Sequence, residues 1–228
     1  MSCKKQDMFT VGGRLTLAPG DTLYLEHRAL AGTVLLDSVV LKEDGKFRFK
    51  QPAPGNPEFY QLTIGDQSVV FSVDSAETLY VTADAKNLYH TFKVEDSYSN
   101  DRLREVDRLT ANASSGINEL EKMHNAGEID DMTYLDRFDS ILVSHKSVIS
   151  KLILDNPSGA AAYYAVFQRI NGYLVFDPYD KSDYAMFGAV ATSWNRFYPD
   201  TERTGHLYDF TMTAMQTRRR QEQQEKML

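Results

Sequence analysis

The chain has one cysteine, Cys3, among its 228 residues, and this scarcity excludes an internal disulfide. It also excludes the zinc sites that take several cysteines. No run of the sequence approaches the roughly 20 apolar residues of a membrane-spanning helix, and no complete signal peptide precedes Cys3. Lysine and arginine total 25 against 32 acidic residues, a net charge of −7. We therefore expect no nucleic-acid partner, because phosphate binding needs a basic face.

Catalytic motifs are also missing. The sequence contains no Cys-x-x-Cys, His-Glu-x-x-His or Gly-x-Ser-x-Gly motif, no phosphate-binding glycine loop and no dinucleotide fingerprint. The five histidines are scattered without ligand spacing: His27, His90, His124, His145 and His206. We therefore predict no catalytic, cofactor-binding or metal-binding residues, no cofactor, and no enzymatic activity for this chain.

The first part of the chain has the apolar period of β-strands. From Phe9 to about Glu95, roughly eight short apolar runs alternate with turn sequences, the last run being "LYHTFKVE". The Asp44-Gly45 pair is the strongest hairpin signal among these turns, because glycine permits the positive φ that such turns need. The pattern predicts an antiparallel β-sandwich over residues 8–95.

The second part has helical spacing. A first helix is expected after "EDSYSND", weakened at "ASSG", and a second has Leu135, Phe138, Leu142, His145, Ile149 and Leu152 on one face. A short turn between them favours an antiparallel helical hairpin. A last helix begins near Thr201 and loses its apolar residues toward "QTRRRQEQQEKML", which suits a spacer. The fold class is therefore α+β, a sandwich followed by an all-helical segment over residues 98–228.

Two groups of residues have a functional and a structural interpretation. His145 could be a pH switch or a ligand, but a histidine packed between helices and bonded to a neighbour is favoured. Three nearby carboxylates could bind calcium, namely Asp177, Asp180 and Asp183. Their spacing differs from that of a calcium-binding loop, in which alternate residues are ligands. Turn and cap roles are favoured for Asp177 and Asp180.

Two longer stretches also have alternatives. "SGAAAYYAVFQ" could line a ligand cleft, but core packing is favoured. "RRRQEQQEK" could be a basic patch, but a solvated helix face is favoured because glutamate and glutamine interleave with the arginines.

Several stretches together resemble one family. They are "FTVGGRLTLAPGDTLYLEH", "LLDSVVLKEDGKFRFKQP", "PEFYQLTIGDQSVVFSVDSAETLYVTAD" and "NPSGAAAYYAVFQ". They resemble the N-terminal domain of unknown function (4369) of envelope lipoproteins in certain Gram-negative bacteria. In such proteins the module usually precedes a thioredoxin-like or peroxiredoxin-like domain. The resemblance therefore implies that a thiol–disulfide oxidoreductase domain follows Leu228, and that the redox chemistry belongs to that domain.

The resemblance also implies a role for the single cysteine. Ser2-Cys3 is similar to the end of a lipoprotein signal, where a small residue precedes the cysteine that is acylated. We expect Cys3 to be the lipid anchor and the only contact with a membrane. The alternative is a terminal cysteine without a role.

Two functions are consistent with the sequence. The first is a non-catalytic module of a lipid-anchored, periplasm-facing envelope lipoprotein, which tethers or recognises clients for the downstream thioredoxin-like domain. The alternative is a stand-alone binding protein that holds a small molecule or peptide in a cleft between sandwich and helices.

Overall fold

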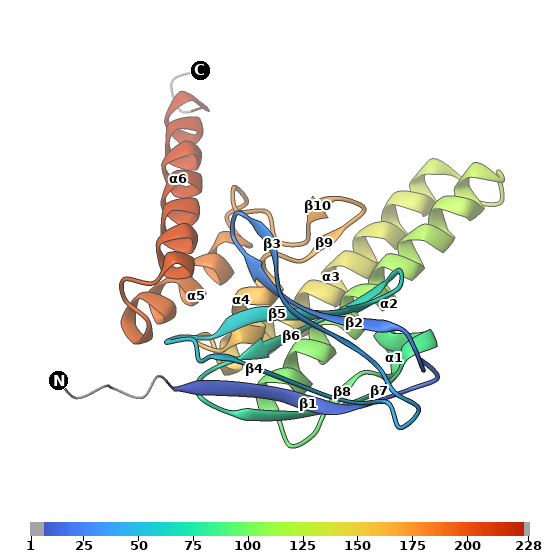
Figure 1. Cartoon of the computed structure of the whole chain (residues 1–228). Helices are drawn as coiled ribbons and strands as arrows, with labels where there is room; N and C mark the ends of the chain where they lie inside the picture. The colour runs from blue at the N-terminus through green and yellow to red at the C-terminus, as the bar shows by residue number, and fades with distance from the viewer. Residues whose placement is uncertain (1–6, 226–228) are drawn as a thin grey trace. The chain divides into compact units, whose positions relative to one another are not determined.

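The computed structural model describes residues 7–225, so the proposed anchor Cys3 lies outside the described residues. The chain divides into two compact units between Leu103 and Arg104. The first unit is built mainly from strands and the second mainly from helices (Figure 1), as the α+β class predicts. In the part of the chain that the structure describes, no helix is both long and apolar enough to span a membrane.

The first unit consists of two four-stranded sheets. The strands are β1 (Met8–Thr16), β2 (Thr22–Ala29), β3 (Gly32–Val40), β4 (Lys46–Pro52), β5 (Glu58–Ile64), β6 (Gln67–Val73), β7 (Thr78–Asp84) and β8 (Lys93–Val94). One sheet has the order β4-β1-β7-β8 and the other β3-β2-β5-β6. Side chains of both sheets join one buried core, in which the rings of Phe9 and Tyr60 lie 4.8 Å apart. The predicted sandwich is confirmed.

One strand pair departs from the antiparallel pattern. β1 and β7 pair in parallel, with Gly13 opposite Val81. A Cβ on Gly13 would lie 1.8 Å from the carbonyl oxygen of Val81, so only glycine allows this close approach. The other strand pairs of the two sheets are antiparallel.

The Asp44-Gly45 hairpin prediction is wrong. The tight turn exists, with Gly45 at φ +64° and its amide donating to the carbonyl of Lys42 over 2.9 Å. However, the strands that it joins belong to different sheets, because β3 pairs with β2 whereas β4 pairs with β1. The turn therefore carries the chain from one layer of the sandwich to the other.

The run predicted as a strand over "LYHTFKVE" is mostly helical. A 3₁₀ turn η1 (Ala85–Asn87) and a short helix α1 (Leu88–Thr91) precede β8. The Asp84 carboxylate accepts from the Lys86 amide at 2.9 Å, and the Gln67 side chain accepts from the Leu88 amide at 2.8 Å. These side chains satisfy amide groups that open a helical turn, which local apolar alternation does not reveal.

The helices are α2 (Tyr98–Asn125), α3 (Asp131–Asp155), α4 (Ala160–Val166), α5 (Tyr184–Phe197) and α6 (Glu202–Glu225). α2 is continuous through "ASSG", and α2 and α3 form the expected antiparallel hairpin (Figure 1). On α3, His145, Ile149 and Leu152 are buried, but Leu135 is 58% exposed. The predicted apolar face is therefore buried in the C-terminal part of the helix and does not extend to Leu135.

The second unit is not entirely helical. A two-stranded hairpin, β9 (Arg169–Ile170) and β10 (Tyr173–Leu174), follows α4. Its turn residues Asn171 and Gly172 both have positive φ, as a two-residue type I′ turn requires.

Candidate functional site

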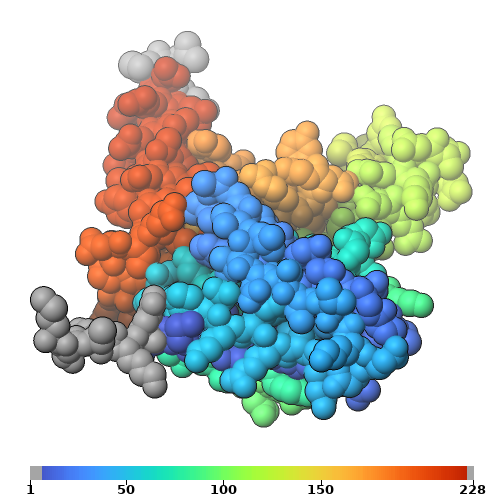
Figure 2. Space-filling view, in the orientation of Figure 1, coloured from blue at the N-terminus to red at the C-terminus, as the bar shows by residue number. Residues whose placement is uncertain are grey.

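The best candidate site is an apolar groove inside the second unit, with a volume of about 280 Å³. α2, α3 and the β9–β10 hairpin form its walls. The lining residues are Ile117, Glu121, Tyr134, Phe138, Leu142, Ile170, Asn171, Tyr173, Leu174 and Val175. The space-filling view shows that the yellow-green end of the α2–α3 hairpin and the orange segment containing β9 and β10 both reach the surface (Figure 2). Tyr173 of the lining is mostly exposed, so the groove is open to solvent at this residue.

Asn171 fixes one wall of the groove. Its side-chain amide donates to Asn118 Oδ1 at 3.2 Å and to Glu121 Oε1 at 3.3 Å, both on α2. Within the hairpin, Arg169 donates to the Gly172 carbonyl over 2.7 Å. The turn that shapes the hairpin thus also attaches it to α2.

Aromatic side chains form a second wall along α3. The rings of Tyr134 and Phe138, one helical turn apart, have centroids 6.0 Å apart, and His124 of α2 lies 4.7 Å from Tyr134. His124 is held in place by Asp131, whose carboxylate is 2.8 Å from its Nε2. Tyr173 completes the aromatic lining from β10 and is 80% exposed.

Sequence reasoning missed this groove. Leu142 and Phe138 were assigned to a helical seam, yet both remain half-buried at the groove. The dipeptide Asn171-Gly172 between "RI" and "YL" is a hairpin signal that could have revealed its third wall. The groove lies wholly in the helical unit.

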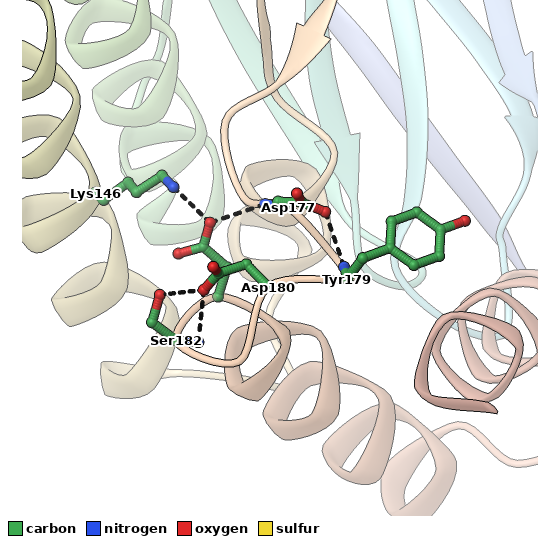
Figure 3. A network of polar contacts seen from close by, with 6 residues as sticks. Lys146, Asp177, Tyr179, Asp180 and Ser182 are labelled. Carbon is green, nitrogen blue, oxygen red and sulfur yellow. Dashed lines mark hydrogen bonds and ion pairs between the residues drawn. The ribbon is translucent and has the colours of Figure 1, made fainter. Parts of the chain in front are cut away.

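The three aspartates considered for calcium form a turn network instead (Figure 3). The Asp183 carboxylate accepts from Lys146 Nζ and, over 2.9 Å, from the Asp177 amide. The Asp177 carboxylate in turn accepts from the Tyr179 amide at 2.8 Å. No cluster of three metal-ligating residues occurs within residues 7–225. The turn interpretation is confirmed.

Asp180 belongs to the same turn. Its carboxylate accepts hydrogen bonds from both the amide and the hydroxyl of Ser182. These bonds stabilise the ionised form and lower the pKa of Asp180. The carboxylate therefore orders the turn that leads into α5.

His145 is a buried core residue, as favoured, with only 7% of its surface exposed. Burial lowers the pKa of its imidazole. Its Nε2 has no hydrogen-bond partner among the described residues, so the expected bond is not made through that atom.

The remaining candidates are structural in the described residues. In "SGAAAYYAVFQ", Tyr163 is buried and its ring lies 4.6 Å from that of Trp194, which confirms core packing. In "RRRQEQQEK", Arg218 is half-buried and lies 4.0 Å over the Tyr184 ring, whereas Arg219 and Arg220 are exposed. That stretch is thus a largely solvated helix face with one docked arginine.

A comparison against protein families gives a match for the first unit only. Residues 9–103 match the domain of unknown function DUF4369, so the family recognised in the sequence is confirmed for the first unit. The description of that family names no catalytic activity.

Comparisons with individual proteins add little. No curated protein matches the chain. A crystal structure of (S)-allantoin synthase is similar at 11% identity, over 39% of this chain and 43% of that chain, with a TM-score of 0.27. So low a score does not establish a common fold.

Proposed function

We propose that this chain is a non-catalytic recognition module of an envelope lipoprotein. Its groove holds segments of client proteins for a thioredoxin-like thiol–disulfide oxidoreductase domain, which follows Leu228 in the same polypeptide. Cys3 carries the lipid anchor, and the module faces the periplasm. The observation that carries the proposal is the open apolar groove between α2, α3 and the β9–β10 hairpin.

The size of the groove is consistent with weak, reversible binding of a peptide. At 280 Å³ it takes one long side chain with part of its neighbours. Burying one apolar side chain contributes about 1.5–3 kcal/mol, so a few contacts give dissociation constants on the order of micromolar or weaker. Such affinity allows a client to be released after its disulfides have been exchanged.

The alternative is a stand-alone binding protein for a small molecule. The groove volume of about 280 Å³ lies near the lower end of the range of small-molecule sites, roughly 300 Å³, so the ligand would be a small one. The sequence of the native gene after Leu228 distinguishes the two proposed functions. A Cys-x-x-Cys-containing domain encoded after Leu228 favours the recognition module, and a stop codon at that point favours the alternative.

The test fills the groove with a larger side chain. Leu142→Trp places an indole inside it, whereas Val143→Trp puts the same indole on the adjacent position, which is 67% exposed and outside the groove. The probe is reduced, carboxymethylated α-lactalbumin, a permanently unfolded protein, labelled for fluorescence anisotropy. We expect Leu142→Trp to weaken binding at least about fivefold and Val143→Trp to leave it unchanged. Equal binding by both variants and the parent chain would refute client recognition by the groove.

The non-catalytic assignment has its own measurement. With dithiothreitol as the electron donor, the chain should not accelerate insulin reduction over buffer, because it lacks the paired cysteines that the reaction needs. Acceleration that disappears in Cys3→Ser would overturn the assignment.

A further inference from the structure

We infer that the groove selects a positively charged side chain, lysine or arginine, flanked by apolar residues in an extended peptide. This inference rests on the proposed client-binding function and adds the chemistry of the bound segment. It follows from the charge, the aromatic lining and the dimensions of the groove.

The charge comes from Glu121, the only charged residue in the groove lining. Its side chain is half-buried, and its one hydrogen bond is the 3.3 Å contact with the neutral amide of Asn171. Among the described residues, no lysine, arginine or histidine forms an ion pair with it. A carboxylate flanked by apolar walls and left without a counter-charge favours an incoming cation.

The aromatic lining favours the same cation. Tyr134 and Phe138 from α3 and Tyr173 from β10 present rings to the groove that contains Glu121. The faces of such rings attract ammonium and guanidinium groups, and the attraction is stronger where water is partly excluded. A carboxylate on the ligand would instead be repelled by Glu121.

The dimensions indicate a long side chain rather than a free ion. Ile117, Leu142 and Leu174 provide apolar surface along the groove. Lysine and arginine lay their methylene groups on such surface while their charged ends reach a polar partner. Apolar residues beside the cation would cover the remaining lining, and the net charge of −7 favours the approach of a basic segment.

The experiment compares three capped pentapeptides with the central sequence Leu-X-Leu, in which X is lysine, norleucine or glutamate. Binding is measured by isothermal titration calorimetry at 50 mM and 500 mM salt. We expect the lysine peptide to bind about tenfold more tightly than the norleucine peptide and the glutamate peptide to bind most weakly. The preference for lysine should shrink at high salt.

Two matched variants assign the selection to one carboxylate. Glu121→Gln removes the charge but retains an oxygen that can accept from Asn171, so it should equalise the lysine and norleucine peptides. Glu119→Gln makes the same charge change two residues away, outside this groove, and should keep the preference. Thermal unfolding of both variants checks that the helices remain folded.

The possible results separate this inference from the proposed function. If lysine and norleucine peptides bind equally and Leu142→Trp weakens both, charge selection is wrong and client binding stands. If no peptide binds, charge selection is wrong, and the α-lactalbumin comparison decides whether client binding stands. If n-butylamine binds as tightly as the lysine peptide, the occupant is a small amine and the peptide is rejected.

Discussion

At the scale of single residues, Asn100 closes the open edge of a sheet. β6 is the last strand of the order β3-β2-β5-β6, and Ser72 lies on it. The Asn100 side chain accepts from the Ser72 amide at 2.8 Å and donates to the Ser72 carbonyl at 3.0 Å. The side-chain amide of Asn100, at the start of α2, thus makes the two hydrogen bonds to Ser72 that a neighbouring strand would otherwise make.

Asn100→Ala should destabilise the protein by about 2–3 kcal/mol, because it leaves two buried backbone groups without partners. Urea unfolding followed by circular dichroism measures the change. Asn112→Ala, on an exposed position of the same helix, is the control and should have little effect. Equal stability of the Asn100 variant and the parent chain would show that water replaces the side chain at no cost.

His145 makes stability depend on pH. Burial lowers its pKa in the folded state, so as pH falls below the unfolded value of about 6.5 the unfolded chain takes up the proton first. Folding stability should therefore decrease as the pH falls from 7.5 to 5.5. His145→Gln should flatten this decrease, and His90→Gln, at an exposed position, should not. Identical pH profiles for the parent chain and His145→Gln would contradict the prediction.

At the scale of secondary-structure elements, α6 combines a packed and a solvated half. Leu207 and Ala214 are buried. One turn further on, the guanidinium of Arg218 lies over the ring of Tyr184 on α5 and forms an ion pair of 3.5 Å with Glu222. The sequence predicts a spacer in which apolar residues are lost, and the contact with Tyr184 shows that Arg218 is still docked. Beyond it, residues 219–224 are exposed.

Hydrogen exchange should reflect this division. We expect strong protection around the buried part of α3 and along α6 as far as Arg218, with weak protection after it, because a short polar helix gains little without packing. Arg218→Ala should lower protection in the preceding turn by roughly fivefold, as the loss of a cation–π contact of about 1 kcal/mol implies. Arg220→Ala, on the exposed face, is the control. Uniform protection to Gln224 would show that the tail is stabilised in another way.

At the scale of the whole molecule, the proposed anchor predicts where the protein is found. When the chain is expressed behind a lipoprotein signal in a Gram-negative host, it should incorporate labelled palmitate and sediment with membranes, because several acyl chains hold a protein firmly. Cys3→Ser should lose the label and appear in the soluble periplasmic fraction. A Cys3→Ser protein that still sediments with membranes would mean that another part of the chain holds it there.

The sequence by itself determined the two architectures and the main structural roles. Alternating apolar residues such as Leu79 and Val81 specify strands, and three- and four-residue steps such as Ile149 to Leu152 specify helices, because these periods follow from backbone geometry. The turn roles of Asp177 and Asp180 were likewise visible, since both bond to amides two residues away.

The tertiary structure alone decided the strand partners and the groove. Asp44-Gly45 encodes a turn, but pairing of β4 with β1 rather than β3 depends on contacts between residues far apart in the chain. The groove likewise brings Glu121, Phe138 and Tyr173 together from three elements. Local periodicity indicates which face of a helix or strand is apolar. It does not indicate which other element packs on that face, or whether the face stays exposed.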